Sequence, residues 1–181
     1  MNSDLLKPLS DLNNWLASEE LDIQLVVIGA FAIHLHGFSN RMTMDIDTVT
    51  PLTDNKLLQQ INEIGEKYGL PRWLNDQADN LIMPDDFEKR LLVNSDFSHI
   101  KLFYVSRLDL IKLKVAAYFY RGSNDSKDKD DLISLKLTLG ELEEALRFLK
   151  QKHSPDTSKF KADFSARLME ISHELNNLVQ R

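Results

Sequence analysis

A short β-branched apolar run stops at Gly29, and a second strand-like segment carrying two closely spaced acids follows it. The run predicts a buried strand over Gln24–Ile28, and the glycine predicts a break before a short helix over Ala30–Leu35. A second strand is predicted over Met44–Thr50, because Pro51 ends it. The chain is therefore expected to build a sheet around the glycine turn.

The second predicted strand contains Asp45 and Asp47, which one residue separates. Side chains on a strand return to the same face every second residue, so the two carboxylates would lie roughly 6.6 Å apart along the chain. Like charges at that spacing repel each other unless a positive group sits between them. A divalent cation such as Mg²⁺ meets this need, since it prefers carboxylate oxygens. The alternative is a solvated strand end, which short acidic motifs often are.

The remaining periodicity predicts mostly helices. Helices are expected over residues 3–18, 54–68, 106–120, 130–137, 138–152 and 157–179, and strands over 70–74 and 99–105. Residues 121–129 are predicted to form a charged loop, and 87–93 fit neither type. The pattern is α+β: a small mixed β-sheet core flanked by helices, with a helical C-terminal part. Residues 1–137 are expected to form the main domain, with the helices of 138–181 packed on it.

Composition limits the classes of function. A net charge of −6 argues against a broad basic surface for polyanions. The sequence has no cysteine, which excludes disulfides, thiolate zinc sites and cysteine nucleophiles and suits a reducing compartment. The first residues lack the basic-then-apolar order of a signal peptide, and the apolar run Leu25–Ile33 is far shorter than the roughly 20 residues that span a bilayer. We expect a cytoplasmic protein without a membrane segment.

The glycine turn, the start of the following helix and the paired acids would each have a function in binding a nucleoside triphosphate with magnesium. A glycine permits close approach of the backbone, and the start of the following helix offers free N–H groups to phosphate oxygens. Two metal ions held by paired acids can activate a hydroxyl and stabilise the departing pyrophosphate.

The segment around the turn reads VVIGAFAIHLHGFSNRMTMDIDTVT. It resembles the signature of the nucleotidyltransferase superfamily with the polymerase-β-like fold: an apolar strand, Gly-Gly or Gly-Ser, a spacer, and Asp-x-Asp on the next strand. The Arg-x-Thr-x-Asp-x-Asp variant that begins at Arg41 resembles bacterial families related to AbiEii-type toxins. The later segment LDLIKLKVAAYFYRGSNDSKDKDDL, with Lys114 and Asp131, is similar to a second motif of those families.

The resemblance implies a Mg²⁺-dependent enzyme and assigns a role to each motif residue. The implied metal ligands and catalytic acids are Asp45 and Asp47, and the implied nucleotide-binding residues are Gly29, Ala30, Arg41, Thr43 and Lys114. Active members of the superfamily also carry a third carboxylate on a later strand. The predicted strand over 99–105 has no acid, so Asp76 is the substitute that the sequence offers. A second departure is Ala30, which stands where the families have glycine or serine.

Ordinary structural roles compete with these assignments. Arg41 fits an exposed loop charge as well as a phosphate contact. Lys114 lies on a mostly apolar helix, where a lysine usually extends its charged end into solvent. Asp128 and Asp131 belong to a charged run, and we interpret both as structural, with a preference for the positive end of the next helix.

Two functions follow from the resemblance. The first is transfer of a nucleoside monophosphate from a triphosphate to a hydroxyl of tRNA, a protein or a small molecule, in a toxin–antitoxin or phage-defence setting. The second is a nucleotidyltransferase fold with little or no catalysis that serves as an antitoxin or interaction module and binds a cognate toxin. A third interpretation is an α+β scaffold whose motifs match by accident, which predicts no acidic pair facing a cleft.

Overall fold

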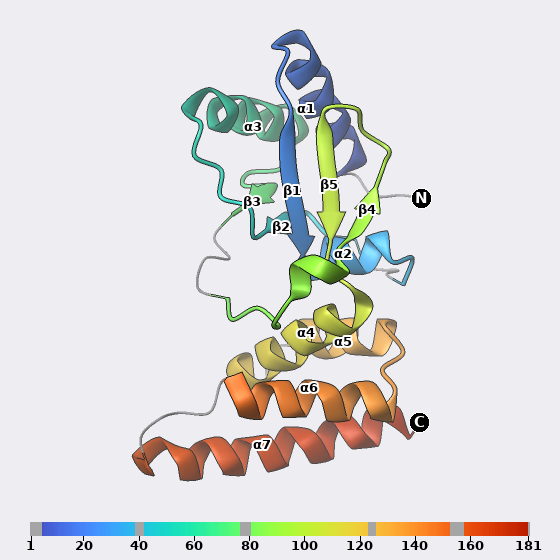
Figure 1. Ribbon diagram of the computed structural model, residues 1–181, viewed down its shortest axis with the longest axis vertical. Coiled ribbons are helices and arrows are strands. Elements are labelled where there is room, and N and C mark those ends of the chain that lie inside the picture. Colours follow the sequence, from blue (N-terminus) through green and yellow to red (C-terminus); the bar gives the residue numbers. More distant parts are fainter. Residues whose placement is uncertain (1–4, 39–41, 77–80, 123–125, 153–157, 181) are drawn as a thin grey trace. The chain divides into compact units, whose positions relative to one another are not determined.

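The computed structural model describes residues 5–38, 42–76, 81–122, 126–152 and 158–180 (Figure 1). The chain divides into two compact units. The first contains residues 1–81 and 88–106, and the second contains 82–87 and 107–181. The fold is α+β with a helical C-terminal part, as the sequence predicts. In the described part of the chain, every helix is too short or too polar to cross a membrane.

The first unit is built on a five-stranded mixed sheet. Its strands are β1 (Ile23–Ile28), β2 (Ile46–Thr48), β3 (Leu74–Asn75), β4 (Leu92–Asn94) and β5 (Ile100–Tyr104). They lie in the order β3-β2-β1-β5-β4 (Figure 1). Strand β1 pairs parallel with β5 and antiparallel with β2, β2 pairs parallel with β3, and β4 pairs antiparallel with β5. The predicted small mixed sheet is confirmed.

The strand register separates two faces of this sheet. Val27 pairs with Thr48 on one face, where both side chains are fully buried. On the other face Ile28 pairs with Asp47, and Asp47 pairs in turn with Asn75. Because side chains alternate along a strand, these three residues form one row across three strands. The row places an acid and an amide at the carboxyl end of β1, where the glycine turn begins.

Three helices complete the first unit: α1 (Leu6–Ser18), α2 (Gly29–Leu35) and α3 (Asn55–Tyr68). Helix α3 starts as the sequence predicts, because the Asp54 carboxylate accepts a hydrogen bond from the Leu57 N–H at 2.7 Å. Gly69 ends it in the left-handed conformation at φ +65°. The segment that the sequence left unassigned contains a 3₁₀ turn, Phe87–Arg90, followed by β4.

Strand β2 is shorter than the predicted strand over residues 44–50. Threonine hydroxyls add to the backbone hydrogen bond from the Val49 N–H to the Val26 carbonyl where the strand ends. The Thr48 hydroxyl donates to the Val26 carbonyl at 3.0 Å, and the Thr50 hydroxyl accepts from the Val26 N–H at 2.9 Å. These bonds satisfy the backbone of β1 without regular strand geometry at residue 50. Strand β3 likewise lies at 74–75 rather than over 70–74.

The second unit is helical. It contains α4 (Arg107–Arg121), α5 (Ser126–Ser134), α6 (Leu139–Lys152) and α7 (Ser158–Val179). Helix α4 packs against α5 and α6, and α6 packs against α7 (Figure 1). The predicted domain boundary at 137/138 lies inside this unit, since residues 107–137 cluster with the C-terminal helices.

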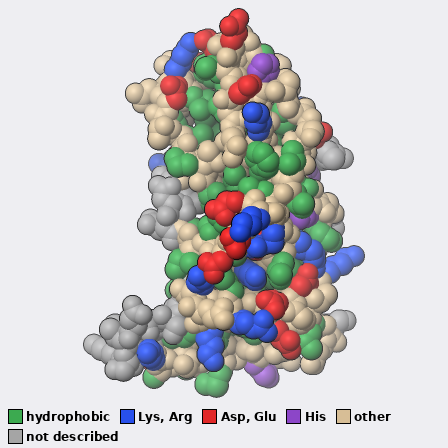
Figure 2. Space-filling model, in the orientation of Figure 1, with side chains coloured by type: hydrophobic (Ala, Val, Ile, Leu, Met, Phe, Trp, Pro, Cys, Tyr) green, Lys and Arg blue, Asp and Glu red, His purple; other side chains and the backbone are tan. Residues whose placement is uncertain are grey.

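Helix α5 begins four residues earlier than predicted, inside the segment expected to be a charged loop. Burial explains the difference, because the Asp128 side chain is only 1% exposed and forms ion pairs with Lys114 and Arg121. The charged run therefore faces buried partners and is not a solvated loop. Elsewhere, Figure 2 shows acidic and basic side chains interspersed on the face in view.

Candidate active site at the glycine turn

Gly29 and Asp47 touch each other at the end of β1. Gly29 has φ +67°, a backbone conformation that side chains with a Cβ rarely adopt. A Cβ at this position would lie 2.5 Å from the Asp47 Oδ2 atom, which is closer than real Cβ atoms approach any group. The backbone conformation therefore favours glycine at residue 29, and a Cβ there would force the Asp47 carboxylate to move. The turn and the carboxylate form one structural unit, as the sequence motif predicts.

Asn75 is the neighbour of Asp47 on β3, and sequence reasoning missed it. Its amide Nδ2 donates a hydrogen bond to Asp47 Oδ1 at 3.1 Å. The sequence analysis names the next residue, Asp76, because the superfamily's third site residue is a carboxylate. The Asp76 Oδ2 atom instead accepts a hydrogen bond from the Leu52 N–H at 2.9 Å. Only the strand register distinguishes these adjacent residues, since it pairs Asn75 with Asp47.

Asp45 lies directly before β2 and is exposed. Because it precedes the regular strand, strand alternation does not by itself fix the direction of its side chain. Thr43 supplies a constraint, since its hydroxyl donates to Asp45 Oδ1 at 3.0 Å and lies 3.2 Å from the Asp45 carbonyl. The predicted role of Thr43 in nucleotide binding stays a prediction. Arg41, the predicted phosphate contact, lies outside the described residues.

Carboxylate oxygens are the side-chain ligands that Mg²⁺ prefers. No group of three or more acidic, histidine or cysteine side chains that could hold a metal ion occurs among the described residues. A third carboxylate beside Asp45 and Asp47 is therefore absent from that part of the chain, and a catalytic role of Asp76 remains a prediction. Mg²⁺ commonly uses one or two carboxylates together with water and substrate phosphates, so the role of Asp45 and Asp47 as its ligands stays a prediction.

Lys114, the second predicted phosphate contact, belongs to the second unit. Its side chain is 12% exposed, and Nζ lies 3.1 Å from Asp128 Oδ1 and 2.6 Å from Asp131 Oδ2. The lysine is therefore engaged by two buried carboxylates from α5. The structural interpretation of Asp128 and Asp131 agrees with these pairs, whereas a contact between Lys114 and triphosphate stays a prediction.

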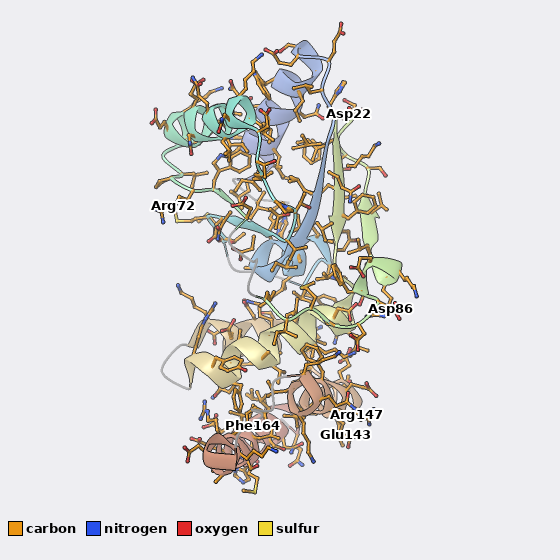
Figure 3. The ribbon with its side chains drawn as sticks, turned by 60° about the vertical axis from the view of Figure 1, so that its left-hand side comes forward. Asp22, Arg72, Asp86, Glu143, Arg147 and Phe164 are labelled. Atoms are coloured by element: carbon orange, nitrogen blue, oxygen red, sulfur yellow. The ribbon has the colours of Figure 1, made fainter. Side chains whose placement is uncertain are left out.

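The second unit also has an open groove of about 600 Å³ between α6 and α7. Glu143 and Arg147 of α6, both labelled in Figure 3, lie on its rim, and Leu146 and Leu168 contribute apolar surface. None of the predicted site residues lines this groove. Of the predicted site residues, Gly29, Ala30, Thr43, Asp45, Asp47 and Asp76 belong to the first unit.

A mixed sheet with an acid packed on a glycine turn suits a protein that binds phosphates. Residues 3–146 match a family described as "Nucleotidyltransferase of unknown function (DUF6036)". Because this match covers most of the chain, the protein belongs to that family. The predicted membership of the nucleotidyltransferase superfamily is thereby confirmed. No match was found among curated proteins or among solved structures.

Proposed function

We propose that the protein binds a nucleoside triphosphate with Mg²⁺ at the glycine turn and transfers its nucleoside monophosphate to a hydroxyl. The contact between the Asp47 carboxylate and Gly29 carries this proposal, because a Cβ at residue 29 would lie 2.5 Å from Asp47 Oδ2. The proposed cation ligand and the turn proposed to approach phosphate are thus adjacent. Membership in a nucleotidyltransferase family supports the same reaction class.

Asp45 and Asp47 are the proposed ligands of the cation. When bound, the ion neutralises phosphate charge and the charge that develops on the departing pyrophosphate. Gly29 leaves the backbone open to the triphosphate, and Thr43 and Asn75 restrain the two carboxylates. The acceptor hydroxyl loses its proton to solvent as its oxygen attacks the α-phosphorus, the bond between the α-phosphorus and the oxygen that bridges the α- and β-phosphates breaks, and pyrophosphate leaves with that oxygen. We propose tRNA, protein or a small molecule as the acceptor, and a toxin–antitoxin or defence role, by analogy with the resembling families.

Thermal stability with ATP, CTP, GTP or UTP plus Mg²⁺ tests the binding step. A ligand present at 100 times its Kd stabilises the folded state by about 2.7 kcal/mol, which a melting curve detects readily. Asp47→Asn and Asp45→Asn should abolish the increase. Asp22→Asn is the matched control, because Asp22 precedes β1 at the end of the strand opposite to Gly29 (Figure 3). Binding that survives both site variants would contradict the proposed site.

A second candidate function is nucleotide binding without efficient transfer. Two observations favour it: Asn75 occupies the position next to Asp47, and Ala30 supplies no hydroxyl. Triphosphates labelled at the α-phosphate distinguish the candidates when the protein is incubated with RNA, with protein and with small hydroxyl compounds. Label retained on an acceptor, and absent with Asp47→Asn, supports transfer. Nucleotide-dependent stabilisation without any labelled product supports binding alone.

A further inference from the structure

We propose that the groove between α6 and α7 binds a second copy of this chain, with the two α6 helices antiparallel. The residues that line the groove belong to the second unit, and most of them lie beyond residue 146, where the family match ends. The proposal therefore goes beyond the proposed function, and nucleotide binding at the glycine turn does not decide it.

The groove has an apolar centre that is open to solvent. Its volume is about 600 Å³, and Leu146, Leu168 and Met169 are its apolar lining residues. The two leucines are half-buried, and Met169 is 69% exposed. Large apolar side chains that gather on one surface mark interaction sites, whereas single scattered ones do not. A helix that lies in this groove would bury all three side chains.

The order of charges along α6 indicates which helix fits. The α6 residues that line the groove lie on one face of the helix, at positions i, i+3, i+4 and i+7: Glu143, Leu146, Arg147 and Lys150. The acid and the last base are about 10 Å apart along the helix axis. This stripe is complementary to its own reverse, because an antiparallel copy brings each Glu143 opposite Lys150 of the other copy. A parallel copy would instead place like charges together.

The contacts within one chain leave this complementarity in place. Arg147 Nη1 lies 2.6 Å from Glu144 Oε1, so the charge in the middle of the stripe is compensated within its own helix. The His173 ring likewise contacts an amide side chain of its own helix, α7, at 3.4 Å. Glu143 and Lys150 are exposed, and neither makes an ion pair with another of the described residues. Both can therefore pair with a second copy.

Two-fold symmetry fits the apolar centre as well as the charged ends. In a two-fold interface each contact occurs twice, with the two residues exchanged. The midpoint between Glu143 and Lys150 falls between Leu146 and Arg147. Leu146 would therefore lie near the two-fold axis, against the aliphatic stem of Arg147 of the other copy.

Sedimentation velocity of the full chain over a range of concentrations measures this association, and the wild type should form a dimer. Glu143→Lys and Lys150→Glu each place like charges face to face at two positions, so either change should raise the dimer Kd about tenfold or more. A mixture of the two variants should form heterodimers with wild-type affinity, because the two lysines of one chain then face the two glutamates of the other. Structural damage does not produce such a recovery.

Lys101→Glu is the matched control for charge. Lys101 is exposed on β5 of the first unit and does not line the groove, and its substitution changes the net charge as Lys150→Glu does. This variant should retain the wild-type dimer Kd. Met169→Ser tests the apolar centre, and it should raise the dimer Kd about tenfold or more while circular dichroism shows unchanged helix content.

Three results would overturn the proposal. The first is a wild-type chain that stays monomeric at every soluble concentration. The second is a dimer whose Kd responds no more to the groove variants than to Lys101→Glu, because another surface then holds the copies together. The third is a pair of charge variants that remain monomeric when mixed, since antiparallel pairing of α6 requires recovery. Dimers that return only in the mixture support it.

Discussion

Single residues determine the candidate site through contacts that leave little room for change. Gly29 combines a positive φ with direct contact to the Asp47 carboxylate. Asn75 restrains that carboxylate from the neighbouring strand. The structure therefore packs the Asp47 carboxylate against the turn, where the Asn75 amide also holds it.

We expect Gly29→Ala to destabilise the protein and to abolish nucleotide-dependent stabilisation. The left-handed conformation costs about 1–2 kcal/mol for a residue with a Cβ, and displacement of Asp47 adds to this cost. Urea unfolding measures the first effect, and melting with nucleotide and Mg²⁺ measures the second. Gly140→Ala is the control, because Gly140 lies in α6 with no atom within 4 Å of an added Cβ. It should stabilise α6 by about 0.5–1 kcal/mol.

Lys114→Met should be strongly destabilising. Asp128 and Asp131 are 1% and 5% exposed at their side chains, and the substitution leaves two buried carboxylates without their shared cation. Breaking a buried pair in this way costs about 3–5 kcal/mol. Lys152→Met is the control in the same unit, since its pair with Asp85 is largely exposed and is worth about 0–1 kcal/mol. Similar unfolding free energies for the two variants would contradict a stabilising role of Lys114.

At the scale of elements, helix α6 begins with a reciprocal cap. The Glu141 Oε2 atom accepts hydrogen bonds from the Thr138 hydroxyl at 2.8 Å and from the Thr138 N–H at 3.0 Å. Arg107 of α4 adds a two-point contact, with Nε 2.7 Å from Oε1 and Nη2 2.9 Å from Oε2. Glu141 therefore joins the start of α6 to the start of α4 within the second unit.

The stability contribution of Glu141 should depend on pH. Burial raises the pKa of Glu141, but the hydrogen bonds from Arg107 and Thr138 outweigh burial and hold the pKa below its ordinary value of 4.5. A lowered carboxyl pKa stabilises the fold above 4.5, and this contribution is lost as the pH falls through the folded-state pKa. Glu141→Gln should cost about 1.5–3 kcal/mol at pH 7. In urea unfolding the gap to wild type should narrow below pH 4.5, and a constant gap would contradict this assignment.

At the scale of the whole molecule, the two compact units divide the predicted residues. The first unit carries the predicted residues Gly29, Asp45 and Asp47 together with Asn75, which only the structure identifies, whereas the second carries Lys114 in a buried ion cluster. The family match, residues 3–146, ends within α6 and does not include α7. Nucleotide binding is therefore expected to slow amide exchange mainly in the first unit, which contains the sheet.

Hydrogen exchange can locate this effect along the chain. With nucleotide and Mg²⁺, amide exchange should slow in peptides that cover residues 24–30, 45–48 and 74–76. Peptides from α7 should not change. Protection of α4 around Lys114 would support the predicted triphosphate contact of that lysine, whereas unchanged α4 would leave it a purely structural residue. Protection confined to α6 and α7 would contradict the proposed site.

Local signals in the sequence determine where several helices and strands of this protein begin and end. The strand that stops at Gly29, the cap at Asp54, the end of α3 at Gly69 and the cap at Thr138 are all predictable, because each depends on residues a few positions apart. The position of Asp45 and Asp47 close after the glycine turn in the sequence is a local signal of the same kind.

Tertiary structure decided the rest, because pairing between distant segments has no local signal. The register of β2 with β3 selected Asn75 rather than Asp76 as the neighbour of Asp47. Burial of Asp128 against Lys114 turned a predicted loop into the start of α5. Strand β4 is short and half exposed, and it forms only because β5 lies beside it. Hydrogen bonds and ion pairs between residues far apart in the sequence depend on burial and geometry, which only the folded chain supplies.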